Sequence, residues 1–370
     1  MTEIAKQPSS AFRLSTEQVI HGLQAWLPSQ LDSPNVTVSD VVAPKGTGFS
    51  NQTFLFSAQW RNQHAANNQQ QFVLQAAPVG KGLFPRYDFA SMARVQQQLG
   101  AVSSVPAARV RGVEVDPKVL GVPFYVMERV AGRAPTDKPP YHRGSWFSDL
   151  TPTTHERVWW SGITAMVQLH ALDVERDGFE FLAHTPWGMP IDANPALTRI
   201  KQWREFMAWA DPEPCAPITA VLLELERTAP PAPTKLSVHW GDAKLSNCMV
   251  DNSRIQALLD WELCGLSVPE EDLAHWLMLD WSLWAVTGNT RLASLPSPER
   301  TVARYQELSG RDAAHVLWWF RFGMVRLAII YHRIMSLLRE RGHVPSTASL
   351  TDVNPMVPLM APIFDKDGLP

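Results

Sequence analysis

The hydrophobic pattern of this chain changes its period once, near residue 135, and that change limits the fold more than any other feature. Before it, apolar and β-branched runs predict strands at Val36 to Val42, Phe49 to Trp60, Gln71 to Ala76 and Pro123 to Val130. After it, helical periodicity takes over, beginning at Val158 to Leu172. Strands followed by helices predict an α+β protein with an N-terminal antiparallel sheet and a mainly helical remainder.

Shorter signals refine this outline. The run Ser15-Thr16-Glu17-Gln18 is typical of a capping box that opens a helix. A second helix is predicted at Phe89 to Leu99, and a third is opened by the pattern Thr153-Thr154-His155-Glu156. A hairpin interrupts the helical half at Cys248 to Asp251 and Ile255 to Asp260. The expected division is an N-terminal lobe at 1–127, a hinge at 128–134 and a helical C-terminal lobe at 135–370.

The composition excludes several classes of protein. Apolar residues make up 45% of the 370 positions, which is ordinary for a folded chain and too high for a disordered one. The formal net charge is -3, so a nucleic-acid partner, which needs a basic surface, is not expected. The three cysteines lack Cys-x-x-Cys spacing and are odd in number, which argues against a zinc cluster and a disulfide framework. The cysteine usage therefore leads us to expect a protein of the reducing cytoplasm. Neither a signal peptide nor a membrane span is predicted, and an oligomer is possible but not indicated.

One segment, His239 to Glu262, combines the residue types of phosphoryl transfer. That reaction needs a carboxylate to orient or deprotonate the attacking hydroxyl, ligands for magnesium, and a cation near the γ-phosphate. Asp242, Lys244 and Asn247 supply one of each within a single loop. The hairpin then delivers Asp260, a hard oxygen ligand of the kind that magnesium prefers. A helix-capping aspartate followed by an unrelated hairpin is the structural alternative, and it would require four residue types to coincide at this spacing.

These residues resemble the aminoglycoside phosphotransferase and choline kinase-like family, whose signature is His-Gly-Asp, four residues, Asn, and later Asp-Trp-Glu. The chain has Trp240-Gly241-Asp242, Asn247 and Asp260-Trp261-Glu262, followed by Asp272-Leu273-Ala274. The resemblance implies a bilobal, protein kinase-like α+β fold, with a nucleotide-binding N-terminal lobe and a larger helical lobe that carries the catalytic loop and the acceptor site. Trp240 stands where the family often has histidine.

By this resemblance, Asp242 is the catalytic carboxylate, Lys244 neutralises the transferred phosphoryl group, and ATP is the donor. Asn247 and Asp260 would hold Mg2+. The adenine should bond the backbone of the hinge, while a Gly-rich loop covers the phosphates. The residues expected to bind ATP are Lys45, Gly46, Gly48, Ser50, Asn51, Gln75, Met127, Glu128 and Val130. A dinucleotide-binding turn at the same glycines would need a parallel strand, turn and helix, which the pattern does not predict there. Met127 is equally compatible with a plain core residue.

The third predicted strand departs from kinase-like folds. Those folds place a Lys or Arg there, paired with a glutamate on the following helix. This chain has Gln75 at the strand position and Met92 at the helix position, so the sequence lacks both partners of the ion pair. The absence of both partners is physically coherent, because a buried glutamate without its cation would destabilise the fold. We hypothesise that Lys45, or alternatively Lys81, supplies the phosphate-binding charge.

The C-terminal half favours an apolar or acyl-type acceptor. Leu295 to Glu299 and Arg304-Tyr305 look like a subgroup of kinase-like domains that act on hydroxyacyl or other apolar small molecules. Polycationic antibiotics call for an acidic pocket. The segment from Trp276 to Trp284 contains one acid, and Val316 to Tyr331 contains none.

Other polar residues have both a structural and a functional interpretation. Asp272 is expected to brace the catalytic loop rather than to contact substrate. Buried, hydrogen-bonded core positions are expected for three histidines, because Asp242 already fills the role of base: His170, His239 and His275. Arg321 and Arg326 are candidates for binding an anionic substrate, although internal pairing is the stronger expectation.

We therefore predict a magnesium- and ATP-dependent phosphotransferase that acts on a hydroxyl group of a small molecule. A degenerate kinase that binds a nucleotide or metabolite without transfer is the alternative, motivated by Gln75 and Met92. The retention of Asp242 together with the metal ligands argues against it. Protein kinase activity ranks last, because Glu262 to Asp272 leaves only about ten residues for an activation segment.

Overall fold

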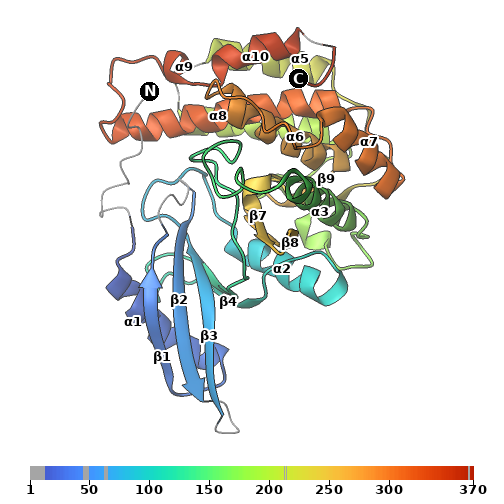
Figure 1. Cartoon of the computed structure of the whole chain (residues 1–370). Helices are drawn as coiled ribbons and strands as arrows, with labels where there is room; N and C mark the ends of the chain where they lie inside the picture. Colours follow the sequence, from blue (N-terminus) through green and yellow to red (C-terminus); the bar gives the residue numbers. More distant parts are fainter. Residues whose placement is uncertain (1–12, 45–49, 62–65, 212, 214, 366) are drawn as a thin grey trace. The chain divides into compact units, whose positions relative to one another are not determined.

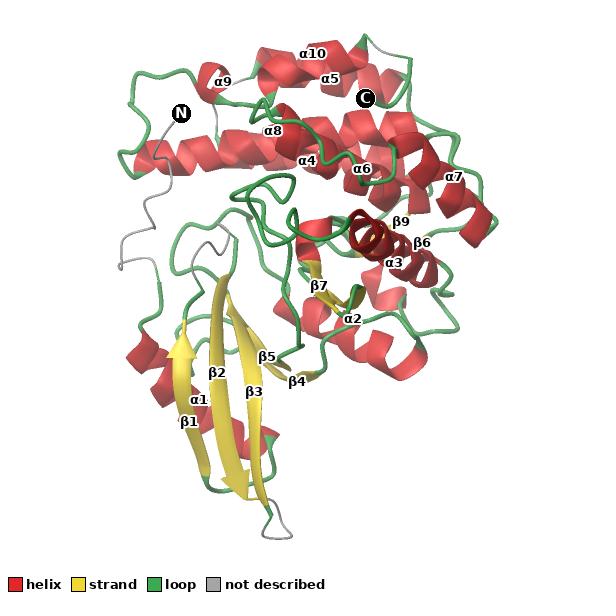
Figure 2. Cartoon of the chain, in the orientation of Figure 1, coloured by secondary structure: helices red, strands yellow, loops and turns green. Residues whose placement is uncertain are grey.

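The structure is a computed structural model that describes residues 13–44, 50–61, 66–211, 213, 215–365 and 367–370. The chain divides into two compact units. Unit 1 extends to Gly100 and includes Ala108–Val130, whereas unit 2 comprises Ala101–Ala107 and Ala131–Pro370. Strands dominate unit 1 and helices dominate unit 2 (Figure 2). The expected lobes at 1–127 and 135–370 and the expected hinge at 128–134 stay a prediction. The two units are defined by contacts within each unit, and such contacts do not identify a hinge.

Unit 1 is built on a five-stranded antiparallel sheet with the strand order β1-β2-β3-β5-β4. The strands are β1 (Val36–Val42), β2 (Gln52–Arg61), β3 (Asn67–Ala76), β4 (Val110–Glu114) and β5 (Phe124–Glu128). Helix α1 (Thr16–Gln30) packs on this sheet (Figure 1), and its Trp26 ring lies 5.0 Å from the ring of Phe124. Helix α2 (Phe89–Val102) connects β3 to β4.

Local chemistry explains these elements. The predicted capping box is confirmed, since Ser15 Oγ accepts from the Gln18 N–H and the Gln18 side chain accepts from the Ser15 N–H. Phe56 of β2 pairs with Phe72 of β3, with ring centroids 5.4 Å apart, so the alternating apolar residues form the core face. The sequence pattern did not predict β4, whose Gly112 weakens the strand signal.

Unit 2 is mainly helical and carries two small antiparallel sheets. The sheets pair β6 (Ser237–His239) with β9 (Gly265–Ser267) and β7 (Cys248–Asp251) with β8 (Arg254–Leu258). The helices are α3 (Pro152–His170), α4 (Pro195–Ala210), α5 (Ala216–Arg227), α6 (Pro269–Ala285), α7 (Pro298–Ser309), α8 (Val316–Glu340), α9 (Leu350–Val353) and α10 (Val357–Phe364), with short 3-10 turns at Glu180–Leu182 and Leu245–Asn247.

The long helix α8 forms the centre of unit 2. It packs against α4, α5, α6 and α10 (Figure 1), and most of its apolar residues are buried. Helix α3 starts earlier than its predicted capping pattern, because Thr151 caps it and Pro152 occupies its first turn. Among the described helices, none combines the length and the hydropathy that a bilayer span requires.

Candidate active site

The loop that carries Asp242 follows β6, and Asp272 of α6 holds its backbone. The Asp272 carboxylate accepts hydrogen bonds from the Trp240 N–H at 2.7 Å and the Gly241 N–H at 2.9 Å. Gly241 has a φ of +94°, and a Cβ at this position would overlap the Leu263 carbonyl group. Only glycine satisfies both conditions. Asp272 thus has the bracing role that the sequence suggested.

Trp240, at the position where the resemblance leads one to expect histidine, connects this loop to the segment that carries Asp260. Its side chain is fully buried, and its indole N–H donates to the Leu259 carbonyl at 2.8 Å. The ring also lies 6.1 Å from the ring of Trp261. Trp240 therefore connects the two halves of the motif.

Asp242 lies among three polar partners. Its Oδ1 accepts a hydrogen bond from His275 Nε2 at 3.1 Å. Its Oδ2 accepts from Asn247 Nδ2 at 2.8 Å and lies 3.0 Å from Lys244 Nζ. Lys244 Nζ also lies 3.6 Å from Asp137 Oδ2. The structure thus brings together three of the predicted site residues, Asp242, Lys244 and Asn247.

Opposite charges keep this group ionised. Burial alone would raise the pKa of Asp242, but Lys244 and the hydrogen bond from His275 outweigh burial and hold that pKa well below its usual range. Burial alone would lower the pKa of Lys244, because it disfavours the charged amine. The carboxylates of Asp242 and Asp137 outweigh burial, so the pKa of Lys244 lies above its usual value. The ion pair is therefore present at neutral pH.

The β7–β8 hairpin returns Asp260 to the same loop. The Leu259 N–H donates to the Asn247 carbonyl at 2.8 Å, which places Asp260 next to Asn247. Burial, and then the charge of Asp242, raise the pKa of Asp260 to about 6. Its Oδ1 is buried and has no hydrogen-bond partner among the residues that the structure describes. A bound cation would satisfy this atom and favour its ionised form.

The donor set at Asn247 and Asp260 fits magnesium held together with phosphate groups. Within the described part of the chain, no three His, Cys, Asp or Glu side chains cluster as a metal site. Magnesium commonly uses one or two protein carboxylates and completes its shell with water and phosphate oxygens. The Asn247 amide nitrogen is engaged by Asp242, so its oxygen is the atom available to a cation.

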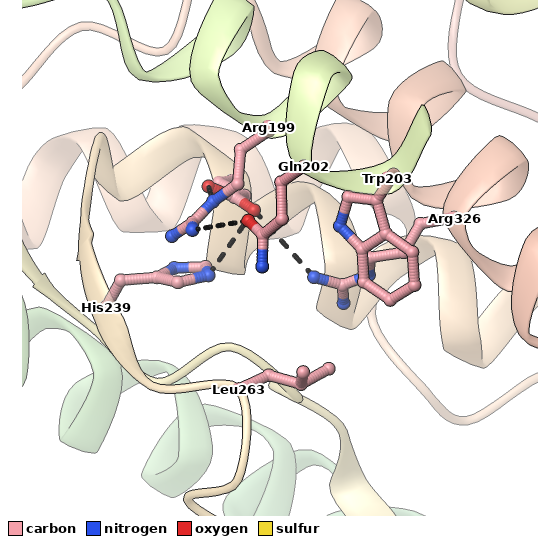
Figure 3. Close-up of a pocket in the computed structure, with 7 residues that line it drawn as sticks. Arg199, Gln202, Trp203, His239, Leu263 and Arg326 are labelled. Carbon is pink, nitrogen blue, oxygen red and sulfur yellow. Dashed lines mark hydrogen bonds and ion pairs between the residues drawn. The ribbon is translucent and has the colours of Figure 1, made fainter. Parts of the chain in front are cut away.

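A second buried polar cluster, centred on Glu271, contacts the backbone of the loop at Gly241. Glu271 accepts from Arg199 Nε at 3.2 Å and lies 3.4 Å from His239 Nε2 and 3.7 Å from Arg326. Figure 3 shows Arg199, His239 and Arg326 around a small cavity. Arg326 also donates to the Gly241 carbonyl at 2.8 Å. The cavity that these side chains line has room for at most about one water molecule, so it is too small for a substrate.

The predicted ATP-binding residues belong to unit 1, and three of them lie outside the described residues: Lys45, Gly46 and Gly48. Ser50 and Asn51 directly precede β2. The Gln75 side chain on β3 accepts a hydrogen bond from the Tyr125 hydroxyl at 2.8 Å. Met92, at the expected glutamate position, is buried in α2. A hydrogen bond between neutral groups thus occupies the strand position where related folds use a cation.

The expected adenine-binding backbone lies at the end of β5. Met127 is buried, as a core residue would be, and Val130 is partly exposed. The Glu128 N–H donates to the Arg109 carbonyl at 2.8 Å, while the Glu128 carboxylate lies 2.6 Å from Arg111. The Glu128 carbonyl and the Val130 backbone are the groups on which the adenine prediction then depends. It stays a prediction.

The arginines of α8 differ in environment. Arg326 is 3% exposed and is held by Glu271 and the Gly241 carbonyl, which is the internal pairing that the sequence favoured. Arg321 donates to the Phe364 carbonyl at 3.3 Å and lies over the ring of Phe364. A substrate role for either arginine stays a prediction.

Sequence reasoning did not identify two neighbours of the predicted site. It treated His275 as a core histidine, and it gave no role to Asp137. The spacing of His275 three residues after Asp272 was a usable signal, because both residues then lie on one face of a helix. Asp137 follows a hinge-like segment in a proline-rich stretch, where no periodic pattern points to a partner.

Comparison with known sequences extends this picture. The profile of the phosphotransferase enzyme family matches residues 42–314, which is more than half of the chain. Human acyl-CoA dehydrogenase family member 11 is 25% identical over 288 residues, which cover 75% of this chain and 34% of the relative. The chain thus spans about a third of the length of this curated relative.

Two solved structures share the fold. A putative aminoglycoside phosphotransferase from Ralstonia eutropha has a TM-score of 0.65 and 21% identity, and the match covers 95% of this chain and 96% of the other. A thermostable mutant of aminoglycoside phosphotransferase APH(4)-Ia in complex with AMP-PNP and hygromycin B has a TM-score of 0.55 and 16% identity, covering 92% of this chain and 99% of the other. The chain therefore belongs to the phosphotransferase enzyme family and has its kinase-like α+β fold.

Proposed function

We propose that this protein transfers the γ-phosphoryl group of ATP, with magnesium, to a hydroxyl group of a small apolar or acyl-type molecule. The observation that carries the proposal is the buried set of Asp242, Lys244, Asn247 and Asp260, which combines a carboxylate, a cation and oxygen donors for a metal. The AMP-PNP complex of a structural neighbour supports ATP as the donor.

The chemistry assigns a separate task to each residue. The acceptor oxygen bonds to the γ-phosphorus while the bond from phosphorus to the bridging oxygen of ADP breaks, and the hydroxyl proton passes to Asp242. Because its pKa is low, Asp242 acts mainly by orienting the hydroxyl, and the proton moves late. Lys244 offsets the negative charge of the phosphoryl group. Magnesium, held by Asn247 and Asp260, would supply further charge neutralisation.

The helices against the catalytic loop favour an apolar acceptor. Helices α6 and α8 contact the loop through His275 and Arg326. The acid on α6 beyond His275 is Asp280, and it is already held by the Tyr141 hydroxyl at 2.6 Å and Arg291 at 2.7 Å. That carboxylate is engaged internally and is poorly placed to attract a polycationic drug. The name of the human relative, an acyl-CoA dehydrogenase family member, also suggests an acyl-type molecule.

A panel assay tests this proposal. Purified protein is incubated with ATP, magnesium and single acceptors: coenzyme A thioesters hydroxylated at different carbons, medium-chain alcohols, choline and an aminoglycoside. We expect ADP release and a phosphorylated product, found by mass spectrometry, with a hydroxyacyl thioester or an alcohol. Asp242→Asn should lose about 100-fold or more in rate. Asp251→Asn, at the end of β7 in the hairpin that follows the catalytic loop, is the control and should retain activity.

A binding protein without transfer activity is the second candidate. The neutral bond between Gln75 and Tyr125, at the position where related folds use a cation, favours it. It predicts ATP binding that is equally tight with and without magnesium, and no phosphorylated product from any acceptor. That combination of results would reject the transferase.

A further inference from the structure

His275 of α6 contacts the predicted catalytic carboxylate at Oδ1, whereas Lys244 and Asn247 contact Oδ2. Its Nε2 lies 3.1 Å from Asp242 Oδ1, and the ring is 3% exposed. Asp272 lies one turn earlier on the same helix and holds the backbone of the same loop. One face of α6 thus contacts both the backbone and the side chain of the catalytic segment.

The ring can act only as a hydrogen-bond donor toward Asp242. Burial, and then the charge of Arg326, lower the pKa of His275 to about 4, so the ring is neutral under ordinary conditions. A neutral ring has one N–H, and the Asp242 carboxylate only accepts, so the proton belongs on Nε2. The other nitrogen, Nδ1, is buried without a hydrogen-bond partner among the described residues. It faces α8 at Gly323, where an added Cβ would lie 3.5 Å away.

One other partner of Asp242, Lys244, has a competing task. Its Nζ lies 3.0 Å from Asp242 Oδ2 and must also reach the transferred phosphoryl group, so its contact with the carboxylate weakens when phosphate is engaged. Asn247 can bind magnesium through its amide oxygen while its Nδ2 keeps the hydrogen bond to Oδ2. The bond from His275 holds the other oxygen, Oδ1, and does not compete with either task.

We propose that His275 is a positioning residue, whose Nε2–H fixes the orientation of the Asp242 carboxylate while Lys244 and Asn247 engage the phosphate groups and the metal. This inference rests on the proposed transferase function. It goes beyond that function by assigning a role to a residue outside the family signature. The expected effect is on the rate of transfer and not on the binding of ATP.

Three substitutions separate this role from a purely structural one. His275→Gln keeps a donor at the distance of Nε2, His275→Asn moves the donor toward the backbone, and His275→Leu removes it. The rate constant kcat and the KM for ATP are measured with the best acceptor of the panel, or with water as acceptor if hydrolysis of ATP is the only turnover. Thermal unfolding midpoints are measured in parallel.

We expect His275→Leu and His275→Asn to lower kcat by roughly 10- to 100-fold with little change in KM, and His275→Gln to recover most of the loss. Wild-type rates in the Leu variant, or equal rates in folded Gln and Asn variants, would overturn the inference while leaving the transferase intact. If the Leu variant fails to fold, the comparison of Gln with Asn decides. A wild-type protein without any turnover would instead reject the proposed function and this role with it.

Discussion

Gly241 is the residue at which a single added methyl group should do most damage to the loop. Its φ is +94°, and the Leu263 carbonyl occupies the space that a Cβ would need. Gly288 is a matched control, because its φ is +64° and no described atom lies within 4 Å of an added Cβ. Gly288→Ala should lower the free energy of unfolding by about 1–2 kcal/mol through backbone strain alone. Gly241→Ala should lower it further and abolish transfer; equal losses in urea unfolding would contradict this account.

His239 should make stability depend on pH in a definite direction. Burial opposes its charged form, but the charges of Asp272 and Glu271 outweigh burial and raise its pKa above 6.5. A raised native pKa contributes stability below the unfolded value, and this contribution is lost as pH rises through the native value. The unfolding free energy of wild type minus that of His239→Gln should therefore shrink as pH rises from about 6.5 through the raised native pKa, by at most about 1.4 kcal/mol per pH unit. A difference that grows with pH would show that the ring is neutral.

The residues of the loop were predictable because they lie close together in the sequence. Asp242, Lys244 and Asn247 lie in one turn of chain, and a single hairpin adds Asp260. His275 and Asp137 were not recognised, because they reach the loop from elements that are distant in the sequence. The contact of Asp137 follows from the packing of the segment after the hinge, which no local spacing encodes. For His275, the three-residue spacing from Asp272 was the one local signal in the sequence.

Helix α4 offers a direct comparison of a buried and an exposed ion pair. Arg199 pairs with Glu271 where both side chains are nearly inaccessible, at 4% and 2% exposure. Arg204, on the same helix, pairs with Glu226 at 35% and 45% exposure. Arg199→Met leaves a buried carboxylate without this partner and should cost about 3–5 kcal/mol in unfolding free energy. Arg204→Met should cost about 1 kcal/mol or less.

Chemical denaturation of the two α4 variants under one set of conditions measures this difference. Similar losses would mean that His239 and Arg326 are sufficient partners for Glu271, and that the cluster tolerates the removal of Arg199. The activity of the Arg199→Met variant adds a second readout, because Glu271 is next to Asp272, which braces the catalytic loop.

Elements with strong local signals were predicted well, including the short strand β7, whereas the three-residue strands were not. Helix α1 begins at the expected capping box, and the strand β1 has the expected bounds, since a capping box and a β-branched run specify them locally. The three-residue strands β6 and β9 were not predicted. These two strands pair with each other, and the catalytic loop lies between them in the sequence. A run of three residues is too short to show the alternation of apolar and polar residues that predicts a strand.

At the scale of the whole chain, the change of hydrophobic period near residue 135 predicted strands before helices. Unit 1 holds the five-stranded sheet and unit 2 holds most helices, as that change implies. The phosphate-binding hypothesis for Lys45 concerns residues outside the described part of the chain, so it stays a prediction. The sequence could not identify the cation that binds the ATP phosphates, because Gln75 stands where kinase-like folds have Lys or Arg. A motif identifies a binding residue only where the chain has the residue that the motif requires.

Asp260→Asn should affect the stability of the whole molecule differently with and without ligand. Without ligand, the substitution removes a buried carboxylate whose pKa is raised to about 6 by burial and by Asp242, so the unfolding free energy should rise or stay the same. Asparagine also tolerates the φ of +62° at this position. With magnesium and ATP at a hundred times the dissociation constant, wild type should gain about 2.7 kcal/mol.

The variant should lose the part of that gain that depends on magnesium. Differential scanning calorimetry of wild type and Asp260→Asn with ATP, first in magnesium and then in excess chelator, measures the gain in stability and the part of it that depends on magnesium. Asp251→Asn, an acid of the same hairpin, serves as the control. If chelation lowers the midpoint of Asp260→Asn as much as that of wild type, the metal is not held by Asp260. If the ligand-free variant is also markedly less stable, the carboxylate has a structural partner in the native state that outweighs its burial.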